Sequence, residues 1–92
     1  MALTKLAMPK KPRWYVYILK CADNSLYTGI TIDVERRVDE HNHDDKLAAK
    51  YTRVRRPVKL VYQESLASRS LAASREAKIK KLKRIEKEAL FK

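Results

Sequence analysis

The chain has 92 residues, which is enough for one small domain with a modest core. Its 22 lysine and arginine residues outnumber 11 aspartate and glutamate residues, and the net charge of +11 favours polyanionic partners. The only cysteine, Cys21, rules out an intrachain disulfide and a thiolate metal cluster. No segment approaches the ~20 apolar residues of a membrane span, and none resembles a signal peptide, so we expect a cytoplasmic protein without membrane contact.

The first third of the chain predicts a basic arm followed by a hairpin. Residues 1–13 hold basic residues and prolines without periodicity, so we expect a flexible basic N-terminal arm ahead of a single domain over 14–92. Residues 14–19 are apolar at both alternating sets of positions, which is typical of a central strand. Turn-forming residues at 23–25 then predict a reversal into a second strand at 26–30.

An amphipathic helix is predicted to follow the hairpin. Thr31 or Asp33 can cap its start, and the pattern continues from about residue 34 to 41. The polar residues 42–45 predict a solvated loop, because His43, Asp44 and Asp45 match no metal-ligand spacing. A short helical turn is expected within 46–51.

The second half predicts one more strand and then helices. Residues 58–62 alternate between apolar and polar types and predict a third strand. Apolar residues recur at helical spacing from 66 to about 83, and a second short helix is expected over 85–91. The expected fold class is therefore α+β, a small three-stranded antiparallel sheet flanked by helices.

Tyr17 and Tyr27 face each other across the predicted hairpin and form the first candidate site. Aromatic residues suit strands, so packing alone would explain either tyrosine. Gly29 is the only glycine, and a glycine inside a strand often marks the close approach of a ligand or another backbone. We therefore keep both tyrosines as catalytic candidates and Gly29 as a structural one.

Arg37 and His41 are four residues apart and share one face of the predicted helix. A surface arginine and histidine are usually solvated, and Arg36 is expected to be the more exposed neighbour. Beside a phosphate, however, the guanidinium offers a planar set of donors and the imidazole a proton acceptor.

Glu76 is a carboxylate that the helical spacing places beside the apolar positions Ala72 and Ile79. A charge there is costly unless it is paired or binds a metal. A salt bridge to a neighbouring cation is one interpretation. The other is one divalent ion held by this carboxylate, by water and by phosphate oxygens.

These residues together resemble the GIY-YIG nuclease superfamily, in particular its small stand-alone bacterial members. The first motif corresponds to Val16-Tyr17-Ile18 and the second to Tyr27-Thr28-Gly29. The similarity continues through the arginine helix, through Tyr51-Thr52-Arg53 and through residues 75–80. Two features depart from the family pattern: Tyr15 stands where a leading glycine is common, and no asparagine follows residue 42.

The resemblance implies an endonuclease that hydrolyses DNA phosphodiester bonds with one Mg²⁺ or Mn²⁺ ion, in DNA repair or in the processing of structured DNA. Tyr17 and Tyr27 would be its paired tyrosines, Arg37 its catalytic arginine, His41 an additional polar group and Glu76 its metal ligand. Either Tyr17 or His41, the latter through water, would act as the general base. Targeting would come from a partner protein, a homodimer or the shape of the DNA.

Two other functions remain open from the sequence. The first is a nucleic-acid-binding module with little or no catalysis, and the second is a basic structural protein on ribosomal RNA. In every case binding would rest on basic and aromatic side chains. The residues expected to bind nucleic acid are Arg36, Tyr51, Arg53, Arg55, Arg56, Lys78 and Lys80.

Overall fold

The computed structural model describes residues 13–92, and the predicted arm therefore lies outside the described residues except for Arg13. Three antiparallel strands form one sheet in the order β2-β1-β3. The strands are β1 (Trp14–Lys20), β2 (Leu26–Thr31) and β3 (Lys59–Leu66). The predicted hairpin and the central position of the first strand are both confirmed.

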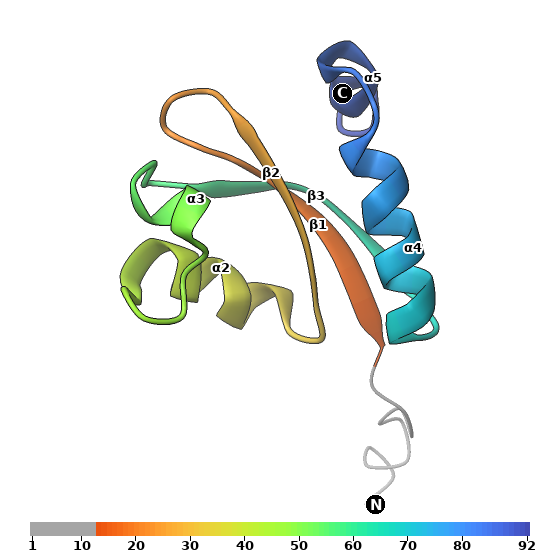
Figure 1. The fold of residues 1–92 in the computed structure, drawn as a ribbon, viewed down its shortest axis with the longest axis horizontal. Coiled ribbons are helices and arrows are strands. Elements are labelled where there is room, and N and C mark those ends of the chain that lie inside the picture. The colour runs from red at the N-terminus through yellow and green to blue at the C-terminus, as the bar shows by residue number, and fades with distance from the viewer. Residues whose placement is uncertain (1–12) are drawn as a thin grey trace, which may run out of the picture.

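Helices cover both faces of this sheet, so the molecule has three layers (Figure 1). On one side lie α2 (Val34–His43) and the short α3 (Lys50–Arg53). On the other side lies α4 (Arg69–Lys80), followed by α5 (Arg84–Ala89) at the C-terminal end. Among residues 13–92 no helix has the length and apolar character needed to cross a membrane.

Strand β1 is buried on both faces, and its alternating side chains divide the core in two. Val16 and Ile18 pack with Ile79 of α4 on one face. Tyr17 and Leu19 pack on the opposite face, beneath α2 and α3. The two-sided apolar pattern of the strand is explained by this sandwiched position.

Short polar contacts decide where the helices begin. The Asp33 carboxylate accepts a hydrogen bond from the Arg36 amide at 3.1 Å, which caps α2. The Ser68 hydroxyl accepts one from the Leu71 amide at 3.1 Å and caps α4 in the same way. Asn24 has a φ of 72° in the β1–β2 turn, where asparagine tolerates the left-handed region.

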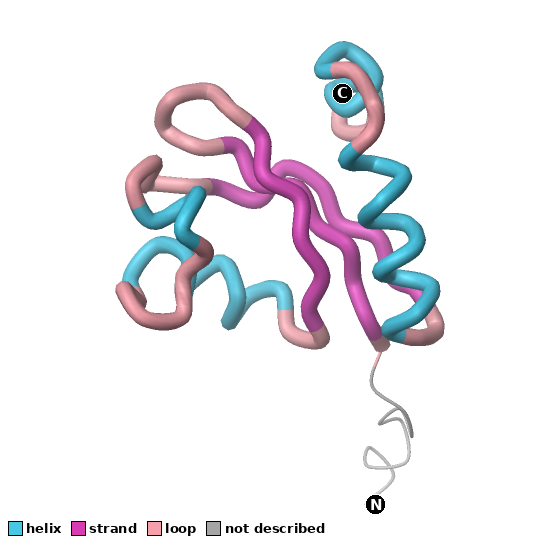
Figure 2. Tube along the Cα trace, in the orientation of Figure 1, coloured by secondary structure: helices cyan, strands magenta, loops and turns pink. Residues whose placement is uncertain are grey.

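Three predicted boundaries are wrong; Figure 2 shows the helices, strands and loops as the structure has them. Helix α2 ends at His43, so the first two residues of the predicted loop at 42–45 are helical. The third strand extends to Leu66, which pairs with Trp14 of β1 and does not belong to the following helix. The short helix lies at Lys50–Arg53, later than the expected 46–51. Strand pairing between residues so far apart in the chain extends β3, and no local pattern reports it.

Candidate active site

Tyr17 lies across Gly29, its direct partner on the neighbouring strand. A Cβ atom at position 29 would stand 2.5 Å from the Tyr17 hydroxyl oxygen and 2.7 Å from Cζ. The absence of a side chain at Gly29 therefore makes room for the phenol ring over β2. The close approach at this glycine is made by a tyrosine side chain of the same sheet, where the sequence predicted a ligand or another backbone.

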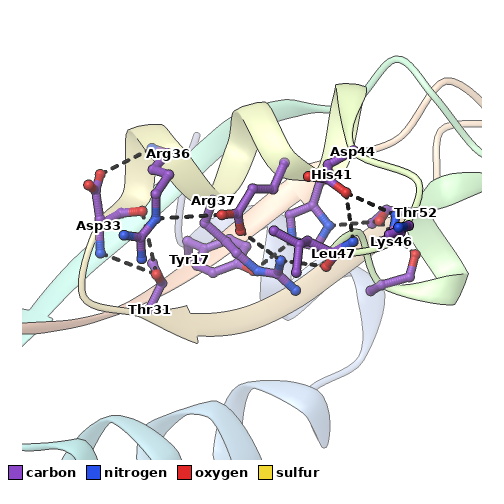
Figure 3. Close-up of polar contacts among 12 residues, drawn as sticks. Tyr17, Thr31, Asp33, Arg36, Arg37, His41, Asp44, Lys46, Leu47 and Thr52 are labelled. Carbon is purple, nitrogen blue, oxygen red and sulfur yellow. Dashed lines mark hydrogen bonds and ion pairs between the residues drawn. The ribbon is translucent and has the colours of Figure 1, made fainter.

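The Tyr17 hydroxyl begins a chain of buried hydrogen bonds (Figure 3). Its oxygen lies 2.8 Å from Nε2 of His41, and Nδ1 of His41 lies 2.7 Å from the Thr52 hydroxyl. His41 and Thr52 have no exposed surface, and Tyr17 is 1% exposed. Side chains from β1, α2 and α3 thus form one buried line of hydrogen bonds, Tyr17–His41–Thr52, within the hydrophobic core.

Burial changes the proton affinity of both titratable groups in this line. Burial, with smaller contributions from Tyr27 and Glu76, raises the pKa of Tyr17 far above its ordinary value, while Arg37 lowers it. Burial lowers the pKa of His41 from 6.5 to about 4, and Arg37 and Arg56 act in the same direction against Glu40. At neutral pH the resting site therefore holds a protonated phenol against a neutral imidazole.

Arg37 extends from α2 to the side of Tyr17. Its Nη1 donates to Glu40 Oε1 at 3.0 Å and to the Leu47 carbonyl at 2.7 Å. The side chain is 24% exposed, and its charge lowers the pKa of the Tyr17 phenol. Arg36 is 57% exposed and forms only a longer ion pair with Glu40, so it lies outside this line as expected.

Glu76 lies on α4, the helix of the opposite layer, and it nevertheless acts on Tyr17. Its carboxylate makes a small contribution to the raised pKa of the Tyr17 phenol. The same carboxylate forms a 3.2 Å ion pair with Lys80 and is 23% exposed. Of the two interpretations made from the sequence, the salt bridge is present, and the metal site stays a prediction.

Tyr27 connects the buried line to an exposed aromatic stack. Its ring centroid is 5.2 Å from that of His41 in an edge-on arrangement, and 6.0 Å from that of Tyr51 in a stacked one. The Arg55 guanidinium covers the Tyr51 ring at 3.8 Å. Tyr51 is 36% exposed, so this stack reaches the surface beside the tyrosine pair.

Two hollows open near the opposite ends of β2, and lysine or arginine side chains line each of them. One, of about 230 Å³, is lined by Tyr27, Tyr51, Lys80 and Lys87, among others. The other, of about 440 Å³, is lined by residues that include Trp14, Arg36, Arg37, Glu40 and Arg69. Gly29, with Tyr17 above it, lies on the strand between them. Lys87 and Arg69 belong to no sequence motif, and only the folded structure shows that they lie beside the site.

The other side chains predicted to bind nucleic acid differ in their exposure and in the hydrogen bonds they already form within the protein. Lys78 is exposed on α4, and Arg53 is exposed while one of its nitrogens donates to the Asp45 carbonyl. Arg55 is bound to Asp23 and to the Tyr51 carbonyl. Arg56 points inward: it donates to the His41 carbonyl at 2.7 Å and to Asp45 at 2.8 Å, and its Nη2 is buried without a partner.

Thr52 is the member of the buried line that sequence reasoning missed. Its neighbours Tyr51 and Arg53 were selected for aromatic and basic character, whereas a threonine carries no such signal. Only its complete burial and its bond to His41 show its place. Among residues 13–92 no group of three or more His, Cys, Asp or Glu side chains could hold a metal ion.

Comparison with protein families gives one match over nearly the whole described chain. The model of the GIY-YIG catalytic domain matches residues 13–89. The UPF0213 protein DP2720 of Desulfotalea psychrophila is 52% identical over 82 residues, which cover 89% of this chain and 74% of that protein. A UPF0213 protein of Syntrophus aciditrophicus is 55% identical and covers 85% of this chain and 88% of its own.

Solved structures agree with this fold. The UPF0213 protein BH0048 from Bacillus halodurans, solved by NMR, is 45% identical with a TM-score of 0.53, covering 85% of this chain and 81% of its own. The protein EF2693 from E. faecalis, also solved by NMR, is 43% identical with a TM-score of 0.59, covering 89% and 85%. The expected α+β fold class is confirmed by both likenesses.

Proposed function

The chain belongs to the GIY-YIG family, and from this membership and the geometry of its site we propose that it hydrolyses phosphodiester bonds of DNA with the help of one divalent cation. One observation carries the proposal. A buried tyrosine hydroxyl is held 2.8 Å from a neutral histidine, and its pKa is lowered by Arg37 from one layer and slightly raised by Glu76 from the other. Packing alone does not require a tyrosine and a histidine to be bonded in the core in this way.

The proposed reaction uses Tyr17 and His41 in series. His41 has no exposed surface, and the Tyr17 hydroxyl already occupies its Nε2. A proton moves from the attacking water to the Tyr17 oxygen while the Tyr17 proton moves to His41 Nε2. The water oxygen bonds to phosphorus, and the bond to the leaving sugar oxygen breaks.

Positive charge must assist this transfer, since the resting pKa values keep the proton on Tyr17. Arg37 provides part of that charge, because it lowers the pKa of Tyr17. Its guanidinium, which cannot lose its proton, also suits the charge that grows on the phosphate oxygens in the transition state.

Glu76 is the residue that would hold the cation. One carboxylate, with the other ligand positions filled by water and phosphate oxygens, suits Mg²⁺ or Mn²⁺. The Lys80 ammonium forms an ion pair with this carboxylate at 3.2 Å, and it would have to move away for a cation to bind. A bound cation would neutralise Glu76 and stabilise negative charge on the leaving oxygen.

The DNA backbone is proposed to follow β2. Cations at both ends of this strand, Lys80 and Lys87 at one and Arg36 and Arg69 at the other, would neutralise phosphates on either side of the scissile bond. Arg53 and Lys78 would extend this surface. Arg56 is not included, since its guanidinium is used inside the protein.

The test is incubation of the purified protein with single-stranded, duplex and branched DNA, with Mg²⁺, with Mn²⁺ and with a chelator. Cleavage of at least one DNA that requires the metal supports the proposal. Absence of cleavage from every DNA with either metal would contradict it.

A DNA-binding module without catalysis is the second candidate. The Glu76–Lys80 ion pair favours it, because the proposed metal ligand already has a partner. DNA binding that is equally strong with Mg²⁺ and with chelator, without any cleavage, would select this function.

A further inference from the structure

We propose that Thr52 is a positioning residue, which holds His41 in the tautomer with its proton on Nδ1 and so makes Tyr17 a proton acceptor toward the substrate. The inference rests on the proposed function for its catalytic consequence. Its structural part can be measured without any nuclease activity. One chain of hydrogen bonds supports it, from the Ala49 carbonyl to the Tyr17 hydroxyl.

The chain begins at the Ala49 carbonyl, which can only accept. The Thr52 hydroxyl lies 3.1 Å from this oxygen, and it must be the donor in that bond. A hydroxyl has a single proton, so Thr52 has none left for His41. We assign the Thr52 proton to the Ala49 carbonyl, so that in the 2.7 Å contact between Thr52 Oγ1 and His41 Nδ1 the donor is Nδ1–H.

A neutral imidazole carries one proton, and the other nitrogen is then an acceptor. With the proton on Nδ1, Nε2 of His41 accepts, and the Tyr17 hydroxyl 2.8 Å away donates to it. The low pKa of His41 keeps the ring neutral at ordinary pH, which supports this assignment. The line of bonds is visible from Tyr17 through His41 to Thr52 in Figure 3.

Arg37 supports the same polarity from the other side of Tyr17. A guanidinium has only hydrogen-bond donors. Its positive charge therefore favours an orientation of the Tyr17 hydroxyl in which the oxygen lone pairs, and not the O–H, face Arg37. The Tyr17 proton turned toward His41 leaves these lone pairs for Arg37 and for the attacking water. The opposite tautomer would place an N–H of His41 against the same oxygen and leave the Tyr17 proton without this acceptor.

The place of Thr52 in the fold suits a fixed role. It has no exposed surface, and it belongs to the four-residue helix α3 (Lys50–Arg53). The Ala49 carbonyl that accepts its hydrogen bond also accepts one from the Arg53 amide at 3.0 Å, so the acceptor is held by the backbone of that helix. Helix α3 thereby determines the direction of a proton path whose reacting end lies on β1.

The experiment uses the full chain and nitrogen NMR of the imidazole rings, in which couplings to the ring protons show which nitrogen carries hydrogen. The protein has two histidines, and His43, whose side chain is 73% exposed, serves as the reference signal in each spectrum. Thr52→Val removes the hydroxyl at nearly constant volume, and Thr52→Ser keeps it. DNA cleavage by the three proteins is measured in parallel.

We expect the proton on Nδ1 of His41 in the wild type and in Thr52→Ser. In Thr52→Val it should move to Nε2. If the wild type cleaves DNA, Thr52→Val should lose at least about tenfold in kcat, a part of the ~10²–10⁴ that proton-transfer catalysis contributes, and Thr52→Ser should stay within about threefold of the wild type.

A wild-type His41 with its proton on Nε2 would overturn the proposal, and this result does not depend on whether Thr52→Val folds. So would a folded Thr52→Val with unchanged tautomer. If the wild type shows Nδ1–H, the valine variant shifts it and neither cleaves DNA, then Thr52 has the positioning role and the proposed nuclease function is wrong.

Discussion

His41 is a histidine whose surroundings keep it neutral, and this has a measurable effect on stability. In the folded protein its pKa is lowered to about 4, against 6.5 for an ordinary histidine. Below pH 6.5 the unfolded chain therefore binds a proton that the folded chain refuses. The free energy of unfolding should fall as the pH drops from 6.5 toward 4, by up to about 3 kcal/mol, with no contribution from His41 above that window.

Denaturant unfolding across this pH range measures the effect. Carboxylates also titrate near pH 4, so the comparison with variants isolates the histidine. His41→Asn should flatten the fall between pH 6.5 and 4, whereas His43→Asn, at an exposed position, should keep the wild-type profile. The same slope in the wild type and in His41→Asn would show that His41 is not held neutral.

Arg37 and Arg36 form a matched pair of adjacent arginines with different surroundings. Arg37 acts on Tyr17, while Arg36 is 57% exposed on the surface of α2. Arg37→Ala should lower the cleavage rate by on the order of 10²–10³, as expected for a group that stabilises transition-state charge. Arg36→Ala should change it only slightly. Single-turnover cleavage rates test this, and equal losses in both variants would remove the catalytic role from Arg37.

At the scale of single residues, the sequence predicts which residues belong to the site better than it predicts their burial and contacts. Tyr17, Tyr27 and His41 could be selected from chemistry and from family motifs, and the fold brings them together. The burial of His41 was not predictable, because a histidine on a helix is usually solvated. It depends on α3 packing over α2, and this contact also brings Thr52 to the ring.

Strand β2 shows how one element makes space for another. A side chain at Gly29 would collide with the Tyr17 ring, as the 2.5 Å and 2.7 Å distances indicate. Gly29→Ala should therefore displace the phenol from His41, lower the free energy of unfolding by about 1–3 kcal/mol and reduce cleavage far more than stability alone explains. Thermal unfolding and cleavage below the melting temperature test this. A variant with wild-type stability and rate would show that the ring can move freely.

Elements with strong local patterns were predictable, and those defined by distant partners were less so. The hairpin, the capped start of α2 and the two C-terminal helices follow from alternation, caps and helical spacing. The last residues of β3 lack that pattern, because Glu64 and Leu66 take their conformation from pairing with β1. The amide of Asn42, which bonds Val58 in both directions, ties α2 to the start of β3 and carries no sequence signal.

At the scale of the whole molecule, the charge of +11 predicts how DNA binding responds to salt. Each phosphate neutralised by lysine or arginine releases counterions, so log K should fall with log salt with a slope of ~0.9 per phosphate contacted on duplex DNA. Titrations from low to physiological salt, with chelator present to prevent cleavage, give this slope. A flat profile would argue against nucleic acid as the partner of the surface along β2.

The central claim joins the two layers of the molecule: Glu76 from α4 holds a cation beside Tyr17 and Arg37, and DNA is cut there. The most direct measurement compares DNA cleavage and DNA binding by the wild type, Glu76→Gln and the control Glu35→Gln, which removes one carboxylate charge from the exposed surface of α2. We expect Mg²⁺-dependent cleavage by the wild type and Glu35→Gln, and loss of cleavage in Glu76→Gln with binding kept or tightened. Equal cleavage by the wild type and Glu76→Gln would contradict the account.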